Sequence, residues 1–234
     1  TLAYIPPTIA GVVLAYRKKY LLGGIITALF IALQIQSNHI QMSYYFMFVI
    51  LFFVGAYFED AYKKKELPHF FKASGVLALA AVVGVCINIS NLYHTYEYSK
   101  ETMRGKSELK QEGAAASQTS SGLDRDYITN WSYGIGETLT LLVPNVKGGG
   151  SGSTMSQSEA AMAKANPMYN GIYSQLPQYF GEQPWTAGPV YVGAFVMFLF
   201  VLGCFIVKGP LKWALLGATI FSILLSWGKN FMGL

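Results

Sequence analysis

Four ionisable residues are candidates for acid–base chemistry: Asp124, Asp126, Glu137 and His39. The two aspartates flank Arg125, and Glu137 precedes a hydrophobic stretch. A positioned carboxylate can act as a general base in group transfer, and histidine titrates near neutral pH. Solvated loop charge explains the acids about as well, and a turn at the water interface explains His39 better. The sequence therefore offers candidates without deciding which residue is catalytic.

A second group of residues could bind a polar ligand. The stretch 33-LQIQSNHIQMSYY-45 gathers uncharged hydrogen-bonding side chains between two apolar runs. Amides and hydroxyls suit sugar hydroxyls or a phosphate, and basic side chains can neutralise a phosphate. The substrate-binding candidates are Gln41, Tyr44, Tyr45, Asn88, Asn91, Arg104, Arg125 and Lys229.

Metal chemistry has little support. Cys86 and Cys204 lie in apolar runs without CxxC spacing or a nearby histidine, so we predict no metal site. Glu97 and Glu101 are four residues apart and could share a helix face and hold a divalent cation, although solvated loop charge explains them more simply. The motifs GxSxG, HExxH and the P-loop are absent from the sequence.

The elements that must position these residues are apolar helices. The 234 residues are 53% hydrophobic and 12% charged, whereas soluble domains carry about 25% charged residues. A helix needs about 20 apolar residues to cross a bilayer. Six runs approach this length: 2–16, 20–37, 42–58, 70–93, 188–207 and 210–227. We therefore predict an all-α polytopic membrane protein with about six transmembrane helices. Because an apolar run already begins at Thr1, we interpret the chain as an internal fragment of a longer protein.

The basic residues predict the orientation of these helices. The links 17–19, 59–72 and 208–212 carry nine of the 17 basic residues and three of the 12 acidic ones. The positive-inside rule places such links in the cytoplasm. The net charge of +5 is then a topology signal rather than a nucleic-acid patch. We expect a multi-pass protein of the bacterial inner membrane with residues 94–187 in an extracytoplasmic loop.

The long loop has distinct parts. Residues 105–122 and 148–160 are polar and low in complexity, which predicts flexibility. Residues 135–143, IGETLTLLV, predict a short helix that ends before Pro144. Aromatic and proline residues in 167–186 are typical of a segment at the membrane interface.

Polar residues gather at the predicted outer ends of four apolar runs. Interfacial solvation explains any one of them. As a group, however, the amides lie within or beside apolar segments, where each needs a hydrogen-bond partner. They are Gln34, Gln36, Asn38, Gln41 and Asn88. We infer an outward-opening cavity suited to a ligand with a polar head and an apolar tail.

Several strings resemble the YfhO family of large bacterial membrane proteins. They are NHIQMSYYFMF, SNLYHTYEYSKETMRG, GLDRDYITNWSYGIGETLTLLVPN and LLSWGKNF. The resemblance implies a GT-C-like glycosyltransferase that uses a polyprenyl-phosphate sugar donor at the extracytoplasmic face to modify a cell-envelope acceptor. In that superfamily the catalytic acid usually lies in the first outer loop, which would precede this chain. No residue here therefore inherits that role.

Two other functions remain open from the sequence. A transporter or flippase for an amphiphilic solute would place polar groups near the membrane midplane and show inverted repeats. The sequence shows no repeat, and its polar groups lie toward one side. A non-catalytic assembly protein would instead use the long loop to bind a protein partner.

Overall fold

A computed structural model describes residues 1–102 and 125–231, and within them the chain forms helices and turns without a β-strand. The chain divides into two compact units. We call Thr1–Gly122 with Val207–Thr219 the helical unit, and Leu123–Ile206 with Ile220–Leu234 the loop unit.

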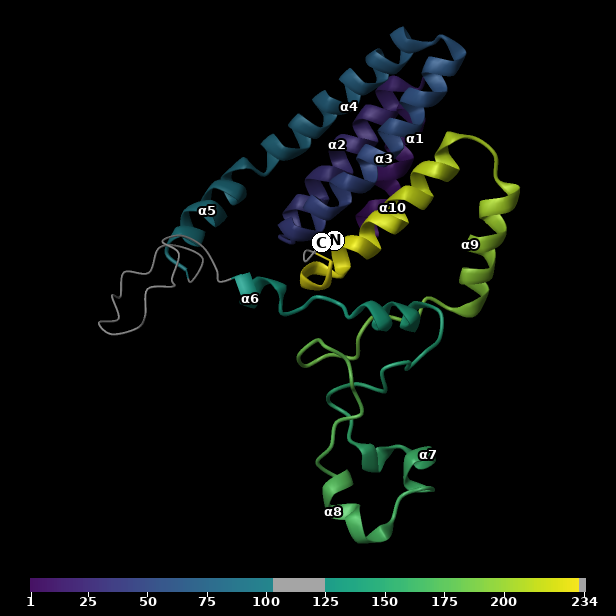
Figure 1. Cartoon of the computed structure of the whole chain (residues 1–234). Helices are drawn as coiled ribbons and strands as arrows, with labels where there is room; N and C mark the ends of the chain where they lie inside the picture. The colour runs from purple at the N-terminus through teal and green to yellow at the C-terminus, as the bar shows by residue number, and fades with distance from the viewer. Residues whose placement is uncertain (103–124, 232–234) are drawn as a thin grey trace. The chain divides into compact units, whose positions relative to one another are not determined.

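The helical unit contains the first five helices of the chain (Figure 1). A short 3-10 turn, Leu2–Tyr4, leads into the first of them. They are α1 (Ile5–Tyr16), α2 (Tyr20–Gln36), α3 (Ile40–Lys64), α4 (Leu67–Ile87) and α5 (Ile89–Lys100). In the loop unit lies α9 (Ala194–Ile206), and α10 (Pro210–Ser226) begins in the helical unit and ends in the loop unit. Each of the six predicted apolar runs contains a helix, but the run 70–93 is divided at Asn88, and the run 188–207 is helical only from Ala194.

Two of these helices are long and apolar enough to span a membrane among the residues described: α3 with 25 residues and α4 with 21. The other apolar helices are shorter. Helices α2 and α10 have 17 residues each, the lower end of the spanning range of about 17–25 residues. Six spans and a GT-C architecture stay predictions.

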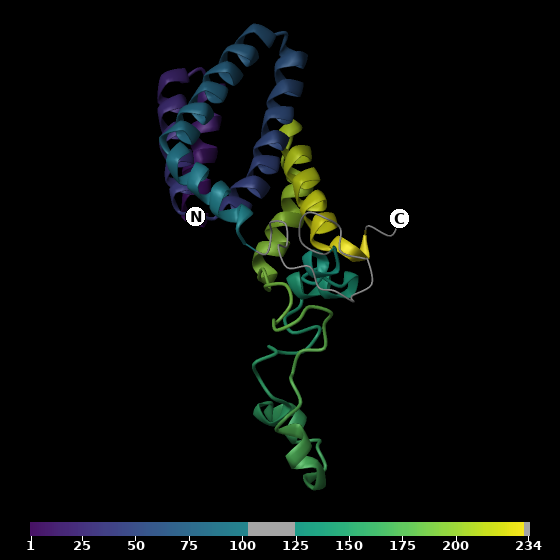
Figure 2. The same cartoon turned by 90° about the vertical axis from the view of Figure 1, so that its left-hand side faces the viewer.

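Glycine allows α1, α2 and α4 to pack closely, side by side (Figure 2). A Cβ on Gly23 of α2 would lie 2.5 Å from the backbone nitrogen of Ala15, and one on Gly11 would lie 2.9 Å from that of Thr27. On the other side of α2, a Cβ on Gly84 would lie 2.8 Å from Ile31 Cγ2. Small residues at such crossings let helix backbones approach, which is the usual basis of helix association in membranes.

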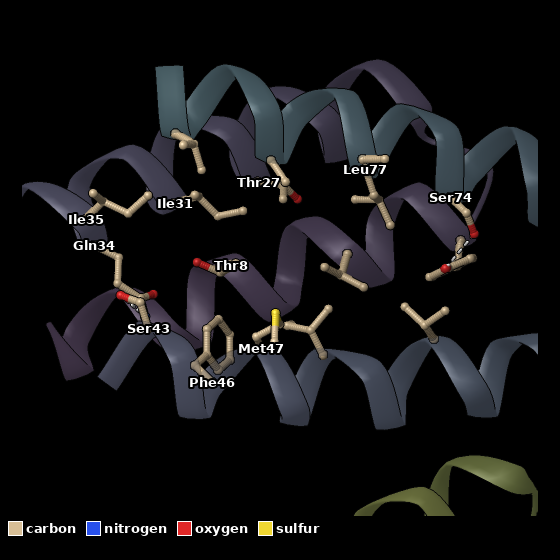
Figure 3. A pocket seen from close by; sticks show the side chains of 17 residues that line it. Thr8, Thr27, Ile31, Gln34, Ile35, Ser43, Phe46, Met47, Ser74 and Leu77 are labelled. Carbon is tan, nitrogen blue, oxygen red and sulfur yellow. Dashed lines mark hydrogen bonds between the residues drawn. The ribbon is translucent and has the colours of Figure 1, made fainter. Parts of the chain in front are cut away.

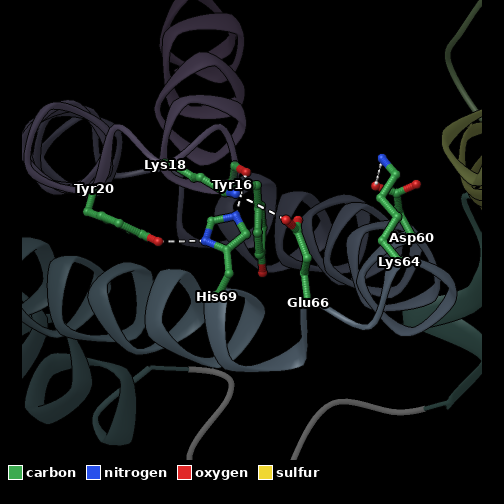
Figure 4. Close-up of polar contacts among 7 residues, drawn as sticks. All are labelled: Tyr16, Lys18, Tyr20, Asp60, Lys64, Glu66 and His69. Carbon is green, nitrogen blue, oxygen red and sulfur yellow. Dashed lines mark hydrogen bonds and ion pairs between the residues drawn. The ribbon is translucent and has the colours of Figure 1, made fainter.

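The link between α1 and α2 lies beside the start of α4 (Figure 4). The ring Nε2 of His69 lies 2.8 Å from the carbonyl oxygen of Tyr16, and Nδ1 lies 2.6 Å from the hydroxyl of Tyr20. A carbonyl can only accept, so Nε2 donates to Tyr16, and Nδ1 pairs with the Tyr20 hydroxyl. An exposed ion pair, Lys18–Glu66 at 3.1 Å, joins the same two segments. Two of the three links that the charge pattern assigns to one side of the membrane, 17–19 and 59–72, therefore lie together.

The loop unit is built from short elements. They are α6 (Arg125–Thr129), η2 (Ile135–Leu141), η3 (Met155–Gln157), α7 (Glu159–Met162), η4 (Pro167–Tyr169), α8 (Asn170–Tyr173) and η5 (Gly228–Asn230), together with α9. The predicted helix over 135–143 is confirmed as the 3-10 helix η2.

Two segments of this unit pair as an irregular ribbon. Isolated antiparallel bridges join Gly148 to Tyr179 and Thr154 to Pro177. Gly148 has a φ of +85°, and a Cβ there would lie 1.7 Å from the carbonyl oxygen of Gln178. Only glycine fits at position 148, because the two backbones approach closely there. This position lies within the segment 148–160 that the sequence predicts to be flexible. The other segment expected to be flexible, 105–122, lies outside the described residues.

Candidate functional site

A cavity of about 490 Å³ lies between α1, α2, α3 and α4 (Figure 3). Its size falls within the range of about 300–1,000 Å³ that is common for ligand sites. The 17 residues that line it are mostly aliphatic or aromatic, and none carries a charged side chain. The cavity can therefore accept an apolar chain but offers no ion to neutralise a charged group.

The polar groups of the cavity lie at both ends and between them. Gln34 and Ser43 lie at one end, Ser74 lies at the other, and Thr8 and Thr27 lie between (Figure 3). Thr8 donates to the carbonyl oxygen of Tyr4 at 2.7 Å, so its hydroxyl has a partner within the helix. The centre of the cavity is therefore mostly hydrocarbon, with the hydroxyls of Thr8 and Thr27 between the two polar ends.

Two buried polar atoms of the cavity have no hydrogen-bond partner among the described residues: Gln34 Oε1 and Thr27 Oγ1. Gln34 is 2% exposed and Thr27 is 3% exposed. The other half of the Gln34 amide is used, since Nε2 donates to Ser43 Oγ at 3.4 Å. Buried polar atoms without partners are rare in native structures, so these two mark the place where a ligand would add hydrogen bonds.

Asn88, a predicted ligand-binding residue, has a structural use instead. It is 8% exposed, and its Nδ2 donates to the carbonyl oxygens of Ala32 at 2.9 Å and Gly84 at 3.2 Å. The bond to Ala32 joins the end of α4 to α2, and the bond to Gly84 stays within α4. The donors of this amide are therefore occupied.

The other polar candidates of the helical unit lie outside the cavity lining. His39 is the N-cap residue of α3 and is exposed, and the other candidates on α3 and α5 are exposed as well. Within the first turns of α3, Gln41 Nε2 lies 3.5 Å from the hydroxyl of Tyr45, at the limit of a hydrogen bond. The exposed candidates are His39, Gln41, Tyr44, Tyr45 and Asn91. The structure thus separates them from the buried end marked by Gln34.

The loop unit encloses Glu137 completely, leaving 0% of it exposed. Its Oε1 accepts from the Tyr179 hydroxyl at 2.5 Å and from the Glu182 backbone N–H at 2.9 Å. Its Oε2 accepts from the Gly134 N–H at 2.9 Å, which is the carboxylate half of a capping box at the start of η2. A Cβ on Gly181 would lie 1.6 Å from Oε1, so only glycine fits there.

These contacts change the chemistry of both partners. Burial and the hydrogen bond to Glu137 raise the pKa of Tyr179 to about 12, so its hydroxyl stays protonated as a donor. The hydroxyl also accepts from the Gln183 N–H at 3.2 Å. A carboxylate surrounded by fixed donors has no open side for a substrate, so the geometry gives Glu137 a structural role rather than that of a base.

The same unit brings Lys229 toward the segment that contains Glu137. The Lys229 N–H donates to Ser132 Oγ at 3.0 Å, and Trp227 Nε1 donates to Thr138 Oγ1 at 2.7 Å. A Cβ on Gly228 would lie 2.1 Å from Ser132 Oγ, so this contact also requires glycine. Residues 226–230 therefore dock on residues 131–138, and the Lys229 side chain is exposed.

Glu182 is a further candidate, which the sequence did not indicate. Its side chain is exposed, and its Oε2 accepts from Asn230 Nδ2 at 2.9 Å, which fixes the orientation of the carboxylate. The available signal was a lone acid in an aromatic, proline-rich segment. Because Asn230 is 48 residues away, the sequence alone does not reveal the pair.

The remaining candidates are exposed, begin a short helix or lie outside the described residues. Asp126 is exposed in the first turn of α6, and Arg125 begins that helix. Asp124 and Arg104 lie outside the described residues. Glu97 pairs with Lys100 at 2.6 Å, and no group of three or more potential metal ligands occurs in the described part of the chain.

Comparison with known proteins adds no identity: no family model, curated protein or solved structure matches the chain.

Proposed function

We propose that the protein is an integral membrane protein that binds a lipid chain in the cavity enclosed by α1, α2, α3 and α4. We further propose that it transfers a sugar from a polyprenyl-phosphate donor to a cell-envelope glycan or lipid. The observation that carries the proposal is the apolar cavity with polar ends. The two helices that are long and apolar enough to span a membrane, α3 and α4, both line it.

A lipid chain fits the chemistry of this cavity. Its centre offers aliphatic and aromatic contacts, and burial of apolar surface against them provides binding free energy of about 25 cal/mol per Å² when the chain leaves water. Within a bilayer the chain exchanges one apolar environment for another. Selection then depends on shape and on the polar groups at the ends.

The proposed reaction is supported by the resemblance to the YfhO family and by one carboxylate of the loop unit. An inverting transferase needs a carboxylate base that reaches the acceptor hydroxyl. Glu182 is exposed and is held by Asn230, so it meets this requirement better than the enclosed Glu137. Under this proposal the exposed Lys229 neutralises a phosphate of the donor.

Lipid binding is tested with the full chain in nanodiscs and a lipid that carries a photoreactive diazirine in its chain. Ala81 lines the cavity on α4, whereas its neighbour Val82 is 57% exposed and does not line it. We expect Ala81→Trp to lower labelling of α1–α4 peptides about tenfold and Val82→Trp to leave it unchanged. Equal labelling in both variants would disprove binding in this cavity.

Sugar transfer is tested with a radiolabelled polyprenyl-phosphate sugar and membrane acceptors. We expect Glu182→Gln to lower transfer by about 10²-fold or more, the usual contribution of a general base. The exposed Glu159 of α7 supplies the matched control, Glu159→Gln. Full activity of Glu182→Gln would rule out this base, and no transfer by the wild type would rule out the reaction.

A further inference from the structure

The two unpaired atoms of the cavity specify more than an apolar ligand. Gln34 Oε1 and Thr27 Oγ1 belong to side chains at least 97% buried, and both residues line the cavity. A cavity that received only hydrocarbon would leave both atoms permanently without hydrogen bonds, which is costly. The ligand therefore carries a polar group of its own.

The free atom of Gln34 restricts the chemistry of that group. Oε1 is an acceptor, so its partner must donate a proton. Phosphate diesters and esters have no donor at neutral pH, whereas an alcohol or an amide N–H does. A hydroxyl can also accept, so it would satisfy the amide even if the Gln34 oxygen turned to Ser43 and the nitrogen faced the cavity.

The charge of the lining points in the same direction. None of the 17 lining residues is lysine, arginine or histidine, so a phosphate inside the cavity would be buried without a counter-ion. The group that reaches Gln34 is therefore uncharged.

The position of the two atoms sets the direction of the ligand. Gln34 lies at one end of the cavity, and Thr27 lies seven residues earlier on α2, about 10 Å along the helix axis. A head group at Gln34 would send its chain past Thr27 toward the end marked by Ser74.

We infer that the cavity holds a neutral lipid with a hydroxyl or amide N–H head, hydrogen-bonded to Gln34, rather than a phosphate-bearing lipid. This inference rests on the proposed function for lipid binding by the cavity, and it names the class of lipid that the cavity takes. The charged phosphate of the donor then binds elsewhere.

Two photoreactive probes with the same diazirine-bearing alkyl chain separate these alternatives: a long-chain alcohol and the corresponding methyl alkyl phosphate diester. With the full chain in nanodiscs, we expect the alcohol to label α1–α4 peptides at a concentration about three- to tenfold lower than the phosphate needs. Gln34→Leu should remove that preference while labelling by the chain persists. Its matched control is Gln36→Leu, an exposed position two residues along α2 that does not line the cavity.

The labelling results test the head-group preference, the role of Gln34 and lipid binding separately. A phosphate preference, or equal labelling by both probes in the wild type, overturns the inference and leaves lipid binding intact. The same alcohol preference in Gln34→Leu as in the wild type overturns the role of Gln34. Failure of both probes to label the cavity overturns the proposed function itself. Thr27→Val, which keeps the side-chain shape, should weaken alcohol labelling only if Thr27 also binds the ligand, and an unchanged result assigns recognition to Gln34 alone.

Discussion

The helical unit and the loop unit solve the problem of buried polar groups in opposite ways. In the loop unit, the buried carboxylate of Glu137 receives three hydrogen bonds, from Tyr179 and from two backbone N–H groups. In the helical unit, Gln34 and Thr27 are equally buried but each leaves one atom without a partner. Full satisfaction indicates structure, and partial satisfaction indicates a place for a ligand. Burial alone therefore does not distinguish a functional residue from a structural one.

Glycine is used differently in the two units, and the largest predicted effect tests this difference in the loop unit. A Cβ on Gly181 would overlap Glu137 Oε1 at 1.6 Å and the Tyr179 hydroxyl at 2.1 Å. We expect Gly181→Ala to destabilise this unit by about 3–4 kcal/mol, because the enclosed carboxylate must lose its donors. Gly171→Ala is the matched control, since nothing lies within 4 Å of that position.

Tryptophan fluorescence during thermal unfolding in detergent measures this change. Three of the four tryptophans belong to the loop unit: Trp131, Trp185 and Trp227. An unchanged midpoint for Gly181→Ala would show that the enclosure of Glu137 contributes little to stability.

The second prediction concerns pH. The pKa of Tyr179 is about 12 in the folded protein, whereas an unperturbed tyrosine, as in the unfolded chain, has a pKa of 10.0. Between these two pH values, only the unfolded chain releases the proton. The stability contribution is complete below pH 10 and is lost as the pH rises toward 12, by about 2–3 kcal/mol. Tyr179→Phe should lack this loss. Parallel pH profiles for the two proteins would contradict the prediction.

The third prediction tests close packing in the helical unit. Gly23→Ala would bring a Cβ to 2.5 Å from the Ala15 backbone nitrogen and 2.7 Å from the Gly11 carbonyl oxygen. We expect a loss of about 1–3 kcal/mol, the usual range for overpacking, because α1 and α2 must separate. Gly75→Ala on α4 adds a Cβ with nothing within 4 Å and should keep the wild-type midpoint. Thermal unfolding followed by circular dichroism compares them, and equal midpoints would show that the crossing tolerates extra volume.

The smallest effect is expected at the exposed ion pair of the helical unit. The side chains of Lys18 and Glu66 are 61% and 46% exposed. Such pairs contribute about 0–1 kcal/mol, so Glu66→Gln should shift the same unfolding midpoint only slightly. A shift as large as that of Gly23→Ala would mean that this pair, rather than helix packing, holds the link between α1 and α2 against α4.

The helices could be predicted because their signal is local. Each apolar run forms a helix, and the ends differ where charges or proline act. Helix α3 continues to Lys64, six residues past the predicted end at 58, because Glu59 and Asp60 pair with Lys63 and Lys64 one turn later. Helix α4 begins at Leu67 rather than 70, and Pro68 suits its first turn.

The site could be predicted only in part, because its decisive contacts join distant residues. The sequence identified Gln34 and Asn88 as amides in need of partners. It could not show that Asn88 finds the backbone carbonyl of Ala32, 56 residues away, while Gln34 retains a free oxygen. Similarly, Glu137 was a candidate base until its contacts with Tyr179 and Glu182, 42 and 45 residues away, enclosed it.

The ribbon of the loop unit has a practical consequence for protein engineering. Segments rich in glycine and serine are the usual choice for inserting an epitope tag or a fluorescent reporter. At 148–150, however, the Gly149 N–H donates to the Gln178 carbonyl at 3.1 Å, and the Gly148 backbone leaves no room for a side chain. An insertion there would separate the two segments of the ribbon next to Tyr179. The exposed short helix α8 gives a reporter more space, since nothing lies within 4 Å of a Cβ at Gly171.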